Sequence, residues 1–241
     1  MPGKNVKLFC GLPLIAWTII QLRCSHSIDE VWLSTDDDEI EAVGLEYGAH
    51  VARRPDWPDA DTVNGIRPTS HAIKAAIDYG GHFDCLVTTI GTSPLRLPGD
   101  IDRLVAKYQA APSPDIEAVF ATRLREVVLR EEEAGGLRMT LFEKRPIYFT
   151  SVGGTKVHGL DFWLRMHGAE VDNDEETATD LWHGLAANKQ WPVTPYVPVE
   201  AWQNTECDTA EEFELAEVLM EHYILRGRGA EVYHEYARRK E

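Results

Sequence analysis

The stretch from Val31 to Thr35 constrains the fold most, because it is a short apolar run that ends in polar residues. A strand that is buried in a parallel sheet and reaches the carboxyl edge of that sheet has this composition. Residues 36–39 then begin a helix that ends at Gly48, and residues 49–52 form the next predicted strand. Acidic side chains in a first helical turn offset the helix dipole, so we interpret Asp36, Asp37 and Asp38 as capping residues in preference to metal ligands.

Further strands and helices follow with similar signals. A helix is predicted over residues 70–79, where apolar side chains share one face and two glycines follow. Residues 84–90 form the next predicted strand, and another helix begins near Asp100. The remaining predicted strands are residues 118–121, 126–130 and 137–141. The last two flank a Gly-Gly pair, which predicts a hairpin at a sheet edge.

The first twenty residues predict a helix that follows a small loop. Pro13 suits the first position of a helix, and residues 14–20 supply its apolar stripe. Before that helix, a turn containing Gly3 brings Lys4 and free backbone N–H groups close to the helix start. Phosphate oxygens can be held at such a place.

Composition limits the classes of function. A chain of 241 residues with a 44% hydrophobic share can bury one sizeable core, so we expect a single domain over residues 1–241. Lys and Arg total 24 against 40 Asp and Glu, and the net charge of −16 repels polyanions. We therefore expect neither nucleic acid nor membrane as a partner, whereas a small anionic substrate requires only a few cations that converge locally.

The cysteines and histidines give no sign of a disulfide framework or a zinc site. Four scattered cysteines without a Cys-x-x-Cys pair are typical of reduced thiols, so we expect a cytoplasmic protein. His158, His167 and His183 lack the spacing of metal ligands, and we interpret them as ordinary surface or packed residues. The apolar run over residues 8–20 is too short to span a bilayer and is broken by Gly11 and Pro13.

Pro2-Gly3-Lys4-Asn5, a connector, and then Pro13-Leu-Ile-Ala-Trp-Thr-Ile19 closely resemble the opening motif of the acylneuraminate cytidylyltransferase family. That family makes CMP-sialic acid and related CMP-sugars. Its motif begins with a strand and an Arg-x-x-Ser-Lys-Gly sequence, and Met1 falls inside the nucleotide-binding loop that follows. The resemblance therefore implies that the family's first strand is lacking. Either the true start lies upstream of Met1, which we favour, or the gene has decayed.

The resemblance covers nearly the whole chain, with its motifs in the family's order. It implies an α/β fold of the nucleotide-diphospho-sugar transferase type, in which helices flank a mostly parallel, Rossmann-like sheet. The predicted hairpin falls where the family has an excursion through which its members pair. The resemblance therefore implies a homodimer.

A first substrate loop follows the strand at residues 49–52. Arg54, Asp61 and Thr62 match the family's Arg-Pro-x-x-Leu-Ala-x-Asp-Thr segment, which faces the nucleotide or the sugar. Gly65 stands where the family has Ser, so one ligand contact differs. The alternative interpretation is a solvated loop whose charges pair with one another.

A second substrate loop lies at the carboxyl end of the strand over residues 84–90, where open α/β sheets place ligands. Thr92, Ser93 and Arg96 match the family's Thr-Ser-Pro-Leu-Arg segment, and the resemblance implies that they bind substrate. The alternative interpretation of Arg96 is a purely structural role. Ile90 and Gly91 replace the family's Gln-Pro, whose Gln helps to hold the substrate. This departure indicates an altered substrate or a weakened site.

A pair of acids precedes the last predicted helix. Thr205 to Glu217 resembles the family's Asp-x-Asp-Thr segment, whose two leading acids bind magnesium, and here these acids are Glu206 and Asp208. Acids two apart on an extended segment point the same way, so both can reach one Mg²⁺ ion. The alternative is that Asp208 or Thr209 caps the helix.

The resemblance implies that CTP reacts with a 2-keto-3-deoxy sugar acid, such as a sialic acid, to give a CMP-sugar and pyrophosphate. Lys4 would neutralise phosphate oxygens, Asn5 would hold the nucleotide, and Asp208 with Glu206 would carry Mg²⁺. One alternative is a related nucleotidyl or glycosyl transferase that uses another nucleotide. Another is a catalytically inactive paralogue that acts as a binding or dimerising partner.

Overall fold

The main sheet of the computed structural model has four strands in the order β10–β6–β9–β5. Their bounds are Tyr196–Pro198 (β10), Ala118–Arg123 (β6), Phe149–Gly159 (β9) and Cys85–Thr88 (β5). β10 is parallel to β6, whereas β9 is antiparallel to both β6 and β5, so three of the four strands share one direction. The structure describes residues 1–57, 66–111, 118–123, 129–131, 137–139, 149–164 and 194–237. The expected α/β sheet is confirmed, with β9 as its antiparallel member.

A second, parallel pair joins β3 (Trp32–Thr35) to β4 (His50–Arg53) in the register Trp32↔His50 to Thr35↔Arg53. Both strands were predicted from the sequence. Helices α2 (Asp38–Glu46) and α3 (Ile66–Asp78) contact this pair. Among the described strands, β3 hydrogen-bonds only to β4, and β5 only to β9. The expected single sheet is therefore present as two hydrogen-bonded units.

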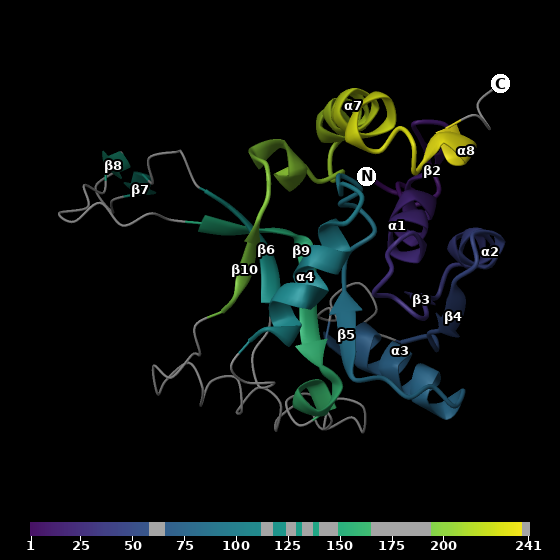
Figure 1. Cartoon of the computed structure of the whole chain (residues 1–241). Helices are drawn as coiled ribbons and strands as arrows, with labels where there is room; N and C mark the ends of the chain where they lie inside the picture. Colours follow the sequence, from purple (N-terminus) through teal and green to yellow (C-terminus); the bar gives the residue numbers. More distant parts are fainter. Residues whose placement is uncertain are drawn as a thin grey trace.

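Helix α1 (Leu14–Arg23) lies between the C-terminal elements and the β3–β4 pair (Figure 1). Every residue from Leu14 to Leu22 is buried, including the polar Thr18 and Gln21. Trp17 and Ile20 join one apolar cluster with Phe9, Phe213 and Tyr233. Ile15 and Ile19 join a second cluster with residues of β6, β9 and α4 (Asp100–Gln109). The predicted helix is confirmed, although it begins at Leu14, and Pro13, predicted as its first residue, is its N-cap. The helix connects the sheet to the C-terminal helices.

The remaining elements lie at the two ends of the chain and in the predicted hairpin. β1 (Leu8–Phe9) and β2 (Leu12–Pro13) form a short antiparallel pair before α1. After β10 come η1 (Ala201–Asn204), α7 (Ala210–Leu219), η2 (Met220–Arg228) and α8 (His234–Ala237). β7 (Leu129–Glu131) pairs antiparallel with β8 (Leu137–Met139), as predicted, but the two form a sheet of their own and join no edge of the main sheet among the described strands. Dimerisation through this pair stays a prediction. Over the described ranges, no helix has the length and apolar character needed to span a membrane.

Candidate functional site

Lys4 and Asp208 meet although they are separated by 204 positions in the sequence. Lys4 Nζ lies 2.5 Å from Asp208 Oδ1, and their side chains are 24% and 54% exposed. The amino group of Met1 also donates to the backbone carbonyl of Asp208, at 3.3 Å. The structure therefore brings together the residue predicted to hold phosphate and the residue predicted to hold a metal.

Glu206, Cys207 and Asp208 lie between two extended residues, Thr205 and Thr209, and the burial of their side chains alternates. Cys207 is fully buried, and its backbone N–H donates to the carbonyl of Thr92 at 2.9 Å. Glu206 and Asp208 are partly exposed and exposed, respectively, on the other side. Thr209 caps α7, where its hydroxyl accepts from the Glu212 N–H in a capping box. Because Thr209 supplies the cap, Asp208 keeps its carboxylate for Lys4 or a ligand.

The loop from Thr89 to Arg96 lies against this pair at the carboxyl end of β5. The Ile15 N–H donates to the carbonyl of Asn5 at 2.9 Å, which fixes the residue after Lys4 to the start of α1. A Cβ at Gly91 would lie 3.7 Å from Asn5 Oδ1, so the loop passes beside the Asn5 amide. The contact between Cys207 and Thr92 ties the same loop to the acidic segment. The segments around Asn5, Thr92 and Cys207, which are distant in the sequence, therefore lie next to one another.

Arg96 supports this loop from inside. It is 5% exposed, and its guanidinium donates to Thr155 Oγ1 at 3.2 and 3.3 Å, to Gln21 Oε1 at 3.2 Å and also to Thr89 Oγ1. It contacts the carbonyl of Ile90 at 3.4 Å as well. Burial lowers the pKa of Arg96 to about 10, so the group stays charged at neutral pH. This network fits the alternative interpretation of Arg96, in which the residue has a structural role.

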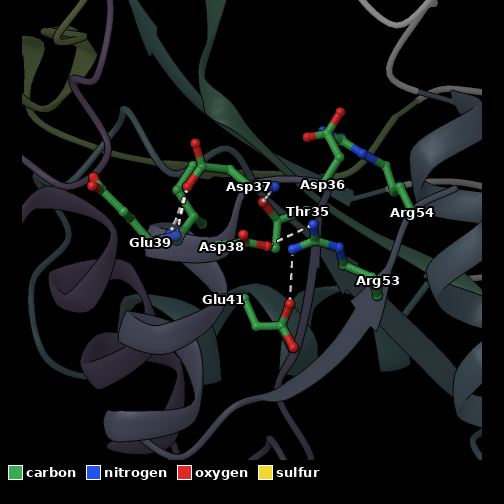
Figure 2. Close-up of polar contacts among 9 residues, drawn as sticks. Thr35, Asp36, Asp37, Asp38, Glu39, Glu41, Arg53 and Arg54 are labelled. Atoms are coloured by element: carbon green, nitrogen blue, oxygen red, sulfur yellow. Dashed lines mark hydrogen bonds and ion pairs between the residues drawn. The ribbon is translucent and has the colours of Figure 1, made fainter. Parts of the chain in front are cut away.

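Arg54 belongs to a separate charged group at the carboxyl ends of β3 and β4 (Figure 2). Its guanidinium donates to the carboxylate of Asp36, which lowers the pKa of that carboxyl. Arg54 Nε is buried and makes no hydrogen bond in the described part of the chain. Arg53 lies between Asp38 and Glu41. Its Nη2 is 2.7 Å from Asp38 Oδ1, and its Nη1 is 2.8 Å from Glu41 Oε2.

Of the three acids interpreted as capping residues, Asp37 is the N-cap of α2, whereas Asp36 pairs with Arg54 and Asp38, in the first turn, pairs with Arg53. Asp37 Oδ1 accepts from the backbone N–H groups of Glu39 and Ile40, at 2.8 and 2.9 Å (Figure 2). Asp37→Ala is expected to lower the free energy of unfolding by about 1 kcal/mol, because two helix N–H groups lose their acceptor. Asp38→Ala, which removes only an exposed ion pair, should change it by less than about 0.5 kcal/mol. Urea unfolding of both variants tests this, and equal effects would contradict the capping role.

Burial, followed by the charges of Asp208 and Glu212, raises the pKa of Glu206. A carboxyl whose pKa is higher in the folded than in the unfolded state binds its proton more tightly when folded. The ionised group therefore costs stability above that pKa, and this cost disappears as the pH falls through it.

Glu206→Gln should accordingly raise the melting temperature at pH 7 in EDTA, and it should have no such effect at pH 4. The rise is at most about 2 °C, because the group is partly exposed and screened. The exposed Glu214→Gln on α7 serves as the control. A lower melting temperature for Glu206→Gln at pH 7 would contradict the assignment.

The acidic pair fits a magnesium ion that is bound together with a nucleotide. Over the described residues, no group of three or more His, Cys, Asp or Glu side chains could form a complete metal cage. Mg²⁺ commonly takes one or two carboxylates and leaves its other positions to water and phosphates. Glu206 and Asp208 supply such a pair beside the Lys4 ammonium.

Some predicted residues lie outside the described part, and some contacts had not been predicted. Asp61 and Thr62 fall in residues 58–65, outside the described ranges. Gly153 and Gly154 lie within β9 and have φ of +65° and +54°, and a Cβ on Gly153 would lie 3.2 Å from Ser93 Cβ. The pairing register of β6 and β9 shifts between Val119 and Ala121. A Gly-Gly pair within a strand often marks a bulge or a close approach, and this signal could have placed β9 beside the site.

Comparison with known proteins gives consistent results. A family model described as cytidylyltransferase matches residues 1–135. The 3-deoxy-manno-octulosonate cytidylyltransferase 2 of Hydrogenovibrio crunogenus is 28% identical over 169 residues, which cover 68% of this chain and 63% of that protein. The N-acylneuraminate cytidylyltransferase A of Danio rerio is 44% identical over 137 residues, which cover 56% of this chain and 30% of that protein. The chain thus spans less than two thirds of the length of both relatives.

Solved structures share the fold. A CMP:2-keto-3-deoxy-manno-octonic acid synthetase complexed with CTP superposes with a TM-score of 0.64 at 17% identity. The match covers 93% of this chain and 94% of that one.

Proposed function

This chain belongs to the cytidylyltransferase family, and we propose that it couples CTP to a 2-keto-3-deoxy sugar acid to form a CMP-sugar and pyrophosphate. The observation that carries the proposal is the convergence of Lys4 with Asp208 and Glu206 beside the loop over residues 89–96. Curated relatives named for 3-deoxy-manno-octulosonate and N-acylneuraminate support this substrate class.

Substrate binding requires an exchange of partners in this site. In the structure, Lys4 and Asp208 neutralise one another across 2.5 Å. With the triphosphate bound, Lys4 would hold phosphate oxygens, and Asp208 and Glu206 would hold Mg²⁺. Both charges thereby keep a partner, so the exchange does not leave an unpaired ion in a partly buried site.

The reaction is then an in-line displacement at the α-phosphorus. The anomeric hydroxyl oxygen of the sugar acid forms the new O–P bond, the bond to the β-phosphate oxygen breaks, and pyrophosphate leaves while the hydroxyl proton passes to solvent. When bound by Asp208 and Glu206, Mg²⁺ would supply positive charge to the phosphate oxygens. Lys4 adds its ammonium to the same oxygens, and Asn5 positions the nucleotide from the start of α1.

The remaining proposed contacts come from two loops. Thr92 and Ser93 lie on the loop that Arg96 holds in place, so Arg96 positions that loop from a buried network. Arg54 adds a partly exposed guanidinium at the ends of β3 and β4. Catalysis in this scheme comes mainly from orientation and charge neutralisation.

The direct test is pyrophosphate release from CTP, UTP, ATP and GTP, each with Mg²⁺ and a panel of 2-keto-3-deoxy sugar acids. It should be run on residues 1–241 and on a version extended by any in-frame codons upstream of Met1. The proposal predicts release from CTP that depends on both the sugar acid and Mg²⁺. Release from another nucleotide would support the alternative transferase. No release, with no effect of CTP on the melting temperature, would contradict the proposal.

A further inference from the structure

Ile90 presents an apolar surface at the proposed site. Its side chain is 42% exposed, whereas its neighbours on the same loop, Ser93 and Leu95, are 3% and 2% exposed. Its backbone carbonyl is held by the buried Arg96 guanidinium at 3.4 Å. The next residue is fixed in turn, because Thr18 Oγ1 donates to the carbonyl of Gly91 at 3.3 Å. Hydrogen bonds to the carbonyls of Ile90 and Gly91 therefore hold the backbone that carries the exposed isoleucine.

The surroundings of Ile90 leave one side of it open. A Cβ added to Gly154 would lie 3.5 Å from each of three Ile90 side-chain carbons, so the Gly154 backbone packs against the isoleucine without covering it. Gly154 is itself exposed and has a left-handed backbone at φ +54°, which disfavours a larger side chain there. Asn5 lies beside Gly91, and Ser93 lies beside Gly153. Ile90 and Gly154 thus form an apolar wall next to the proposed substrate-binding residues.

We propose that Ile90 is a specificity-determining residue that contacts an apolar substituent of the sugar acid, either a C-methyl group or the methyl of an acylamido group. This inference rests on the proposed function and names the substrate class within it. A hydroxyl placed against Ile90 would lose its hydrogen bonds to water and find no acceptor or donor, whereas a methyl group would bury apolar surface. We expect such an apolar surface to favour a methyl over a hydroxyl substituent by about 10-fold in kcat/KM.

The test uses pairs of 2-keto-3-deoxy nonulosonic acids that differ at one carbon, with an acetamido or methyl group in one member and a hydroxyl in the other. The wild type is expected to favour the apolar member of at least one pair by about 10-fold in kcat/KM. Ile90→Gln should reduce that ratio to about 1, because the glutamine amide can hydrogen-bond a hydroxyl. Ile77→Gln is the matched control, since Ile77 is 37% exposed on α3, away from the loop that carries Ile90.

The outcomes separate this inference from the proposed function. Turnover with equal rates for both members of every pair, or a ratio that Ile90→Gln leaves unchanged, would overturn the inference and leave the function intact. No turnover and no calorimetric binding of any acid would overturn both. Because Ile90 is exposed, its substitution should keep the wild-type melting temperature, and this is measured alongside the kinetics.

Discussion

Asp208→Ala is expected to lower CTP-dependent pyrophosphate release by about 100-fold or more, the usual cost of removing a group that organises charge at a reacting phosphate. Asp208 Oδ1 is the acceptor of the Lys4 ammonium, and in our scheme the same carboxylate holds Mg²⁺ in the complex. The loss should appear in kcat as well as in kcat/KM, because the ion acts on the transition state. Asp29→Ala, an exposed acid ahead of β3, should keep the wild-type rate.

Measuring CTP binding in the absence of metal separates the proposed role of Lys4, which is to hold phosphate, from that of Asp208, which is to hold Mg²⁺. In EDTA, Asp208→Ala frees the Lys4 ammonium from its carboxylate, so CTP should bind at least as tightly as it binds to the wild type. Lys4→Met should weaken the same binding by about 10-fold, since a charge-assisted contact to phosphate is lost. Equal weakening in both variants would show that Asp208 acts only by supporting the local structure.

Arg96→Met is expected to lower the free energy of unfolding by about 3 kcal/mol. The guanidinium links Thr155 on β9, Gln21 on α1 and Thr89 after β5, and an apolar side chain would leave these buried polar atoms without their partner. For a chain of this length, that corresponds to a fall in melting temperature of about 6–12 °C. Arg96→Lys should also destabilise, because an ammonium cannot bridge three elements as a planar guanidinium does.

The control for this prediction is Arg226→Met, which removes a guanidinium that is 80% exposed and paired with Glu221. It should change stability by less than about 0.5 kcal/mol. If the Arg96→Met protein proved as stable as the wild type, the buried cation would be replaceable by an apolar side chain, as happens in some buried ion clusters. The positioning role of Arg96 would then have to be abandoned.

Local rules predicted the elements that depend on neighbouring residues. Asp37 was one of three acids predicted to cap α2, and Thr209 was one of two residues considered as the cap of α7; both cap their helices. Helix α1 was predicted from Pro13 and the apolar stripe that follows it. The shared direction of Glu206 and Asp208 follows from alternation along an extended segment, and burial of Cys207 between them confirms it.

Features that depend on distant partners were not predictable in this way. The motif around Arg96 indicated substrate binding, but the acceptors that bury the guanidinium come from α1 and β9, far away in the sequence. The exposure of Ile90 likewise depends on the backbone of Gly154. The antiparallel direction of β9 arises from pairing with both β5 and β6, which no local pattern encodes.

The most direct test of the account is the identity of the product. The chain is incubated with CTP, Mg²⁺ and the best sugar acid, and the products are identified by mass spectrometry. The account predicts an ester whose mass is the sugar acid plus cytidine monophosphate minus water, formed in equal amount with pyrophosphate and lost in Asp208→Ala. Pyrophosphate without that ester, or an ester formed equally well by Asp208→Ala, would contradict it.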